Sequence, residues 1–422
     1  MKLDNCTKQF IAAHLSDDIR TLSLQGDKYP NVDFKQAIIQ IAGRQKIKDK
    51  LPSWYANPDL LFPAQLAIEQ SSSELTARYK ASLVKGDLLI DLTGGLGVDC
   101  TFFAKNFNKV SYFEQQTGLC AIAAHNFRQM QLPIEVTNAD SILKIDQLPL
   151  CDCIYADPAR RNKHGQKMAS LSDCTPDIAE LAPALLKKTK YLLLKLSPML
   201  DISKALSELP AVKEIHIVAV ENECKELLLL MTNEASNLQS FNSSNFQTER
   251  IAAAGSEPRY TCVNLKKNGK QDTFVFSQKE EISAVCAFAA KLEKYIYEPN
   301  ASIFKAGAFR LAAQRFALKK LHLNSHLYTS DSLVKDFPGR SFECLAAFAP
   351  NRRNLKTCLS TINKANITIR NYPLSVNEIR KKTGLKEGGS DYIFATTLAN
   401  GDAVFVLAKK ITPSPSCPAG TK

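Results

Sequence analysis

The chain has 422 residues, a length at which about two to four domains are expected because single hydrophobic cores stop growing well below this size. Its 45% hydrophobic and 23% charged content is ordinary for a globular protein, and no apolar run approaches the ~20 residues that a membrane span requires. The formal net charge of +12 favours a polyanionic partner, with nucleic acid preferred over an anionic membrane.

Twelve cysteines are scattered along the chain. Several stand inside apolar runs, as Cys100, Cys120 and Cys286 do, which is typical of reduced thiols in a core. No CxxC pair occurs, and no charged-then-apolar signal segment opens the chain, so we expect neither a zinc site nor a disulfide scaffold. The sequence therefore predicts a cytoplasmic protein without a bound metal.

The first part of the chain predicts helices without an evident catalytic motif. Gln36–Lys48 is an amphipathic helix candidate, and prolines divide the following residues into short turns. Ser71 stands three residues before Glu74, a spacing that resembles a capping box. We expect this box to open a helix that carries Tyr79 and Lys80 towards the first strand.

Strand and helix patterns alternate between Asp87 and Met231, which predicts a parallel sheet covered by helices on both faces. Helices fit at Thr117–Gln129 and Asp177–Lys187. Only six residues separate the last two strands, too few for a crossover helix, so we expect an antiparallel hairpin at one sheet edge. The pattern is that of a seven-stranded, Rossmann-like α/β sheet. The expected strands are Leu88–Leu92, Val110–Phe113, Ile134–Thr137, Cys153–Ala156, Tyr191–Leu196, Glu214–Val220 and Leu227–Met231.

The rest of the chain predicts a linker followed by small α+β modules. Asn233–Pro258 is rich in Ser and Asn and is typical of a linker. A hairpin, a helix at Glu281–Ile296 and a mixed helical stretch follow. The final module has helices at Asn354–Lys364 and Val376–Thr383. The expected strands are Thr261–Leu265 and Thr273–Ser277 in the hairpin, and Ile367–Asn371, Tyr392–Leu398 and Ala403–Ala408 in the final module.

A glycine-dense turn, Asp91-Leu92-Thr93-Gly94-Gly95-Leu96-Gly97-Val98-Asp99, follows the first expected strand. A dinucleotide fingerprint needs a third glycine where this chain has Cys100, so GxGxxG is incomplete. Acidic residues at the turn suit a cationic amino acid group better than a diphosphate. The turn closely resembles motif I of class I S-adenosylmethionine-dependent methyltransferases. The resemblance implies that S-adenosyl-L-methionine is bound by Asp91, Thr93, Gly94, Gly95, Gly97 and Asp99.

Two further strand ends carry carboxylates. Glu114 ends the second strand, 23 residues after Asp91, where a carboxylate can accept both ribose hydroxyls. Asp140-Ser141 follows the third strand, where methyltransferases commonly place an acceptor for the adenine amino group. We therefore expect Glu114, Asp140 and Ser141 to contribute to the cofactor site.

Asp157-Pro158-Ala159-Arg160-Arg161 follows the fourth strand and looks like motif IV of nucleic-acid methyltransferases. That motif is usually Asp/Asn-Pro-Pro followed by an aromatic residue or arginine, and its carboxylate accepts hydrogen bonds from a target amino group. Ala159 and Arg160 depart from the pattern, and the missing aromatic residue puts an exocyclic amine target in doubt. Arg160 is instead expected to stack on a base or bind a phosphate. Asp157 is also assigned to the cofactor site.

Lys195 ends the fifth strand and Glu226 begins the last one, both in apolar company. A buried lysine must be paired or functional, because burying it alone is costly. With Lys80 and Asp157 these residues resemble the tetrad of ribose 2′-O-methyltransferases, in which a cation favours the deprotonated alcohol. Structural ion pairing explains the same residues equally well. The predicted catalytic set is Asp157, Pro158, Ala159, Arg160, Lys195, Lys80 and Glu226.

Several segments together resemble one subgroup of bacterial class I methyltransferases, which carries a ferredoxin-like segment and a C-terminal THUMP-like domain. THUMP modules in related architectures bind RNA, so the resemblance implies methylation of structured RNA, tRNA or rRNA, at a base or a ribose. The segments are Glu69–Lys80, Asp91–Asp99, Asp157–Arg161, Lys195–Asp201 and Glu223–Leu228.

The resemblance also implies the division of the chain. We expect an N-terminal helical region at 1–68, a methyltransferase domain at 69–278, a ferredoxin-like and helical segment at 279–338, a THUMP-like domain at 339–411 and a flexible tail at 412–422. Two alternatives stay open: a methyltransferase of a protein or small molecule, and a non-catalytic RNA-binding protein with a methyltransferase fold.

Overall fold

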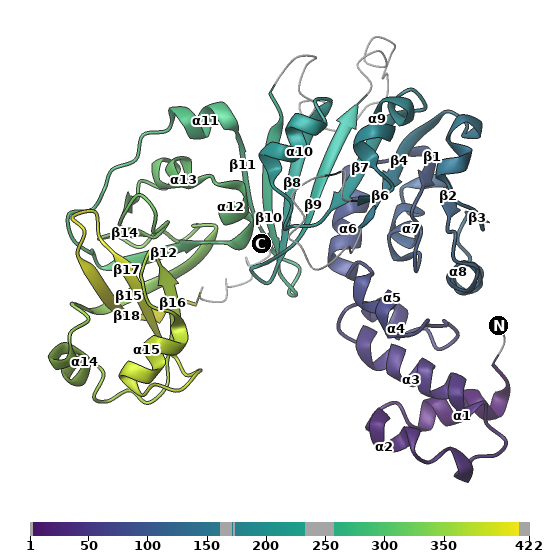
Figure 1. Ribbon diagram of the computed structural model, residues 1–422, viewed down its shortest axis with the longest axis horizontal. Helices are drawn as coiled ribbons and strands as arrows, with labels where there is room; N and C mark the ends of the chain where they lie inside the picture. Colours follow the sequence, from purple (N-terminus) through teal and green to yellow (C-terminus); the bar gives the residue numbers. More distant parts are fainter. Residues whose placement is uncertain (1–2, 161–170, 172–173, 233–256, 413–422) are drawn as a thin grey trace, which may run out of the picture. The chain divides into compact units, whose positions relative to one another are not determined.

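The computed structural model describes residues 3–160, 171, 174–232 and 257–412, which belong to two compact units (Figure 1). The first unit comprises Met1–His216 and Lys225–Ser256, and the second comprises Ile217–Cys224 and Glu257–Lys422. No helix in the described part of the chain has both the length and the apolar composition of a membrane span. All the residues predicted to bind the cofactor belong to the first unit.

Short helices open the first unit and follow one another from purple to blue in Figure 1. Asp4, Asp18 and Asp33 each accept a hydrogen bond from the backbone N–H three residues later, so they fix where the first helices begin. Phe10 and Ile41 belong to a small apolar core shared by these helices. The helices are α1 Asn5–Ala13, α2 Ile19–Ser23, η1 Gly26–Lys28, α3 Phe34–Ile47, α4 Pro52–Tyr55 and α5 Gln65–Gln70.

The large sheet has nine strands in the order β11-β10-β8-β9-β7-β4-β1-β2-β3. From β7 to β3 the neighbours are parallel, whereas β9 is antiparallel to β7. The run from β8 to β3 is the predicted Rossmann-like sheet of seven strands. Its strands are β1 Gly86–Asp91, β2 Phe107–Phe113, β3 Ile134–Thr137, β4 Cys151–Ala156, β7 Thr189–Leu196, β8 Val212–Val220 and β9 Glu223–Thr232.

The connection between β8 and β9 is shorter than predicted. Only Glu221 and Asn222 join the two strands, and both have positive φ angles, 48° and 67°. Two consecutive residues with positive φ form the tight hairpin turn whose twist matches that of the flanking strands. The expected six-residue connection is therefore wrong, and Glu226 lies within β9 rather than at its start.

Helices alternate with the strands of this sheet, as the sequence pattern predicts (Figure 1). The helix before β1 begins at Glu74 and is capped by Ser73, whose hydroxyl accepts a hydrogen bond from the Thr76 N–H at 3.3 Å. The capping box predicted for Ser71 and Glu74 is therefore wrong, because Glu74 accepts from the Ser53 N–H instead. The helices are α6 Glu74–Leu83, α7 Val98–Phe103, α8 Thr117–Gln129, η2 Ile142–Gln147, α9 Ile178–Leu186 and α10 Ile202–Glu208.

Buried polar side chains tie the N-terminal helices to the sheet within the first unit. Arg44 donates to backbone carbonyls within residues 57–60 at 2.5 to 3.2 Å. Asn126 of α8 accepts from the Leu61 N–H at 2.8 Å and donates to its carbonyl at 2.9 Å. Because these buried groups are paired, the segment between α4 and α5 has a defined place beside α8.

The second unit contains the predicted antiparallel hairpin, β10 Arg259–Leu265 with β11 Gln271–Ser277, and a sheet of seven strands. The order of that sheet is β13-β14-β12-β15-β18-β17-β16, with β16 and β17 parallel. Its strands are β12 Tyr295–Pro299, β13 Lys319–Lys320, β14 Tyr328–Ser330, β15 Gly339–Phe348, β16 Asn366–Arg370, β17 Asp391–Thr397 and β18 Ala403–Lys410. Its helices are α11 Gln278–Ser283, α12 Ala301–Ala306, α13 Phe309–Arg315, α14 Arg352–Cys358 and α15 Val376–Thr383.

The helix expected at Glu281–Ile296 does not form. Helix α11 ends at Ser283, and β12 begins at Tyr295. β12 pairs with β14 on one side and β15 on the other, and Ile296 is fully buried. Pairing on both edges and burial outweigh the helical pattern of the sequence. Most of the predicted linker at 233–258 and of the tail at 412–422 lies outside the described residues.

Candidate functional site

A cavity of about 1400 Å³ opens at the carboxyl ends of the parallel strands β1, β2, β4 and β7. Ligands of open α/β sheets bind at this edge, because the loops that follow the strands meet there. Every residue predicted for the cofactor site lines the cavity: Asp91, Thr93, Gly94, Gly95, Gly97, Asp99, Glu114, Asp140, Ser141 and Asp157. Fold topology therefore gathers residues that are spread over 67 positions of sequence, from Asp91 to Asp157.

The glycine turn brings backbone close to its neighbours. A Cβ atom at Gly94 would lie 2.1 Å from the Tyr112 ring, so no side chain fits there. Gly95 and Gly97 have φ angles of 56° and 81°, in the left-handed region that glycine adopts without strain. The Tyr112 hydroxyl donates to the Gly95 carbonyl at 2.5 Å and fixes the turn from below. The glycine turn, held in this conformation, lines the cavity.

Asp91, the last residue of β1 before the glycine turn, is 1% exposed. Its carboxylate accepts hydrogen bonds from the Thr93 N–H at 2.9 Å and from the Cys100 thiol at 3.0 Å. Burial raises the pKa of Asp91 to about 7, and the neighbouring Asp99 and Asp157 add to the effect. Cys100, which stands in place of a third glycine, thus supports the carboxylate of the turn.

Glu114 and Asp140 line the neighbouring part of the cavity. The Glu114 carboxylate accepts from the Gly95 N–H at 2.9 Å and from the Gln116 N–H at 2.7 Å, so the end of β2 is fastened to the glycine turn. Asp140 accepts from the Ile142 N–H at 3.0 Å. Both carboxylates keep further acceptor capacity for a ligand, because each oxygen can accept more than one hydrogen bond.

Asp157, at the end of β4, forms an ion pair with Lys195 at the end of β7, and both line the cavity. The backbone N–H of Asp157 donates to the Thr93 hydroxyl at 2.6 Å, which joins this strand end to the glycine turn. Desolvation raises the pKa of Asp157 even though Lys195 opposes the shift. Pro158 and Ala159 also line the cavity, whereas the Arg160 side chain and Arg161 lie outside the described residues.

Lys80 of α6 is fully buried and does not line the cavity. Its ammonium donates to both oxygens of Glu226, at 2.8 and 2.7 Å, and to the Ser72 hydroxyl at 3.0 Å. It also lies 3.3 Å from Asp99, which accepts hydrogen bonds from Ser72 and Tyr155 at 2.8 Å each. Burial tends to raise the pKa of Asp99, but Lys80 and Lys195 outweigh it and hold the pKa below its usual range.

The four residues of the predicted tetrad are therefore brought together but face different surroundings. Lys195 and Asp157 line the cavity, whereas Lys80 and Glu226 are not among its lining residues. Burial disfavours the charge on Lys195, but Asp157, Glu226 and Asp99 outweigh burial and raise its pKa above the usual value. The Lys195 ammonium therefore belongs to a residue that lines the cavity, whereas the Lys80 ammonium is buried in the protein.

Sequence reasoning missed some residues of this arrangement. Ser72 and Tyr155 complete the pairing of Asp99, yet neither belongs to a motif with chemical meaning of its own. Gln36, Ile39 and Phe62 of the N-terminal segment line the same cavity. Helix α3 carries the first two, and only a tertiary contact reveals their role, because no motif signals it.

Family models match two adjacent parts of the second unit. A ferredoxin-like domain model matches residues 295–338, and a THUMP domain-like model matches residues 339–410. The chain is also similar to a solved structure from Porphyromonas gingivalis W83, described as a "putative methyltransferase". The two share 30% sequence identity over 98% of this chain and 100% of the other, with a TM-score of 0.81.

Other solved structures resemble only part of the chain. A "putative methyltransferase" from Streptococcus mutans in complex with SAH shares 12% identity over 38% of this chain and 96% of its own, with a TM-score of 0.28. An rRNA methylase from Streptococcus thermophilus shares 13% sequence identity over 37% of this chain and 94% of its own, also with a TM-score of 0.28. No curated protein matches the chain.

Proposed function

This chain belongs to the methyltransferase family of the Porphyromonas gingivalis protein, and we propose that it transfers a methyl group from S-adenosyl-L-methionine to structured RNA. The cavity at the ends of β1, β2, β4 and β7 carries the proposal, since it unites the glycine turn with Glu114, Asp140 and the Asp157–Lys195 pair. The acceptor proposed is a base or a ribose of tRNA or rRNA.

The donor and acceptor groups that line the cavity support this cofactor. Gly94 leaves no room for a side chain beside Tyr112, so the backbone of the turn packs closely on this ring, and the turn lines the cavity. We assign the ribose hydroxyls to Glu114, the adenine to Asp140 and Ser141, and the cationic amino acid end to the acidic turn around Asp91. When bound, the cofactor supplies a methyl group activated by its sulfonium.

The chain's own contribution to the transfer lies in the Asp157–Lys195 pair. The Lys195 ammonium stays protonated and stabilises negative charge that develops on an acceptor beside it. The Asp157 carboxylate, whose pKa is raised, accepts a hydrogen bond or a proton from that acceptor. Lys80, Glu226 and Asp99 act behind the pair by holding the charges around it in place.

RNA is favoured as the substrate by two independent features. The net charge of +12 suits a polyanion, and the THUMP domain-like part of the second unit resembles modules that bind RNA. Basic residues of that part include Arg380, Lys381, Lys382 and Lys386.

Calorimetry with S-adenosyl-L-homocysteine tests the cofactor assignment. The wild-type chain should bind it, and Glu114→Gln should weaken binding by about ten-fold, the cost of a weakened charge-assisted hydrogen bond. Glu135→Gln is the matched control, because Glu135 is an exposed glutamate on the neighbouring strand β3 and does not line the cavity. Equal effects of the two substitutions, or no binding at all, would overturn the assignment.

A further inference from the structure

Three aromatic rings and an arginine meet in the second unit, and we name Phe304, Phe309, His326 and Arg370 the aromatic cluster. His326 stacks on Phe309 with ring centroids 3.5 Å apart, and the ring of Phe304 meets both edge-on at 5.9 and 5.6 Å. The guanidinium carbon of Arg370 lies 4.5 Å from the Phe304 centroid. All four residues are only half-buried, so part of each side chain remains open to solvent.

Three cations, Arg370, Arg340 and Lys320, lie in or beside this cluster. Two carboxylates face them, Glu298 and Glu281, and Glu281 accepts from the Phe309 N–H at 3.1 Å. Glu298, almost fully buried, pairs with both Arg370, at 2.7 Å, and Arg340. One carboxylate thus faces two guanidinium groups. The buried Lys320 lies 5.6 Å from the Phe309 centroid and adds a further cation. Burial, together with Lys320 and Arg370, lowers the pKa of His326 to about 4, so this imidazole is neutral near pH 7.

Polar atoms without partners occur on two residues of the cluster and on two residues that adjoin it in a helix cap or a paired strand. Asn300 Nδ2, His326 Nδ1, Arg370 Nε and Thr396 Oγ1 are buried and have no hydrogen-bond partner within the described residues. Asn300 is 1% exposed and caps the helix that carries Phe304, and Thr396 is the cross-strand partner of Arg370. Unpaired buried polar groups lower stability, so several of them on or next to one cluster call for a partner that the described residues do not supply.

We propose that the aromatic cluster binds an unpaired nucleotide of RNA, with the base against the rings and a phosphate beside Arg370. A base stacks on aromatic rings and on a guanidinium plane, and a phosphate offers acceptors to the Arg370 guanidinium, whose side chain is 34% exposed, while balancing the excess charge. This inference rests on the proposed function, because it assigns part of the RNA substrate to a site in the second unit, separate from the cofactor cavity.

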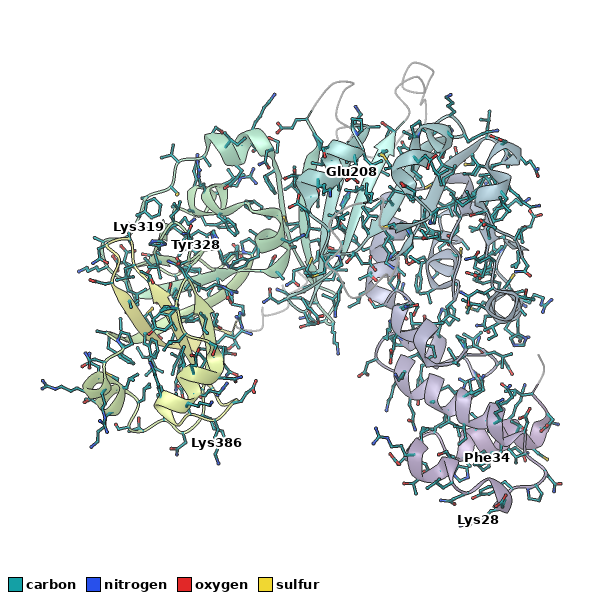
Figure 2. The ribbon with its side chains drawn as sticks, in the orientation of Figure 1. Lys28, Phe34, Glu208, Lys319, Tyr328 and Lys386 are labelled. Atoms are coloured by element: carbon teal, nitrogen blue, oxygen red, sulfur yellow. The ribbon has the colours of Figure 1, made fainter. Side chains whose placement is uncertain are left out.

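Fluorescence anisotropy of the full chain with a labelled single-stranded RNA of about ten nucleotides, and with a blunt duplex of the same sequence, tests the proposal. Arg370→Gln leaves Glu298 paired with Arg340, and His326→Asn keeps a residue that tolerates the φ of 53° at this position. Each should weaken binding of the single strand by about five-fold or more, with little effect on the duplex. Lys386→Gln removes one charge from an exposed position of the same unit (Figure 2) and should affect both probes alike.

The outcomes separate the inference from the proposed function. Wild-type binding of RNA with unchanged affinity in Arg370→Gln and His326→Asn would overturn the aromatic cluster as a site and leave RNA as the substrate. Absence of RNA binding by the wild-type chain would overturn both. If Arg370→Gln or His326→Asn no longer binds S-adenosyl-L-homocysteine, Phe304→Leu takes its place, because leucine keeps an apolar side chain but has no π face. Single-strand binding by Phe304→Leu with the affinity of the wild-type chain would also overturn the site.

Discussion

The ammonium of Lys80 lies 2.7 and 2.8 Å from the two carboxylate oxygens of Glu226, with 0% of the lysine and 5% of the glutamate side chain exposed. Because the pair is desolvated, loss of Glu226 leaves the buried Lys80 ammonium with less compensating charge, since the Asp99 carboxylate lies farther away, at 3.3 Å. Glu226→Leu should therefore lower the free energy of unfolding by about 3–5 kcal/mol in urea denaturation. The double variant Lys80→Met with Glu226→Leu should lose less than the sum of the single variants.

The exposed Lys109–Glu135 pair is the control for this prediction, since its side chains are 57% and 60% exposed. Glu135→Leu should change the free energy of unfolding by less than about 1 kcal/mol. Additive losses in the double variant would show that Lys80 and Glu226 do not act as a pair.

The buried Asp91 carboxyl predicts a pH dependence of stability. Its pKa is raised to about 7, so the native state holds this proton while the unfolded chain releases it near pH 4. The resulting loss in the free energy of unfolding grows as the pH rises from about 4 to 7 and is constant above pH 7. Asp91→Asn removes it, so the variant should gain stability relative to wild type on going from pH 5 to pH 8, on the order of 2–4 kcal/mol. A difference between the two proteins that does not change with pH would contradict the raised pKa.

Gly94→Ala should damage both folding and cofactor binding, because its Cβ would lie 2.1 Å from the Tyr112 ring. We expect a loss of about 1–3 kcal/mol in the free energy of unfolding, the usual cost of overpacking. Gly118→Ala is the matched control among the residues that line the same cavity, since nothing beyond its chain neighbours and its own helix backbone lies within 4 Å of the added Cβ. That variant should be neutral or slightly more stable in thermal unfolding.

Lys195→Met should separate methyl transfer from cofactor binding. The ammonium that we place beside the acceptor disappears, so the rate of RNA methylation should fall by about 10²–10⁴-fold, whereas the affinity for S-adenosyl-L-homocysteine should change little. Lys190→Met is the control, because Lys190 is on the same strand and pairs with Asp152 but does not line the cavity. Equal rates for the two variants would exclude Lys195 from the transfer.

The sequence pattern predicts the sheet well because strand period, glycine turn and strand-end carboxylates are local signals. Asp91, Glu114 and Asp157 can be placed at one sheet edge from the order of the strands alone. Tertiary pairing is not visible in this way. The Tyr295–Pro299 strand is stabilised by neighbours on both sides, and the expected helix at Glu281–Ile296 fails for that reason.

In the candidate site, too, the residues of local sequence motifs could be predicted, whereas contacts between residues far apart in the sequence could not. The Lys-Asp-Lys-Glu set is predicted from two strand ends, one strand start and the helix before the first strand. Its separation into a cavity-lining pair and a buried pair depends on burial. Ser72 and Tyr155 acquire meaning only through their distances to Asp99. The contribution of Ile39 and Phe62 to the cavity requires the packing of the N-terminal helices, which no motif encodes.

The most direct test of RNA methylation is a nucleoside profile of total tRNA and rRNA, measured by mass spectrometry in a strain that lacks the gene. We predict that one methylated nucleoside disappears, that the wild-type gene restores it, and that the gene carrying Lys195→Met does not. A profile that is identical with and without the gene would contradict the central claim that this chain methylates RNA.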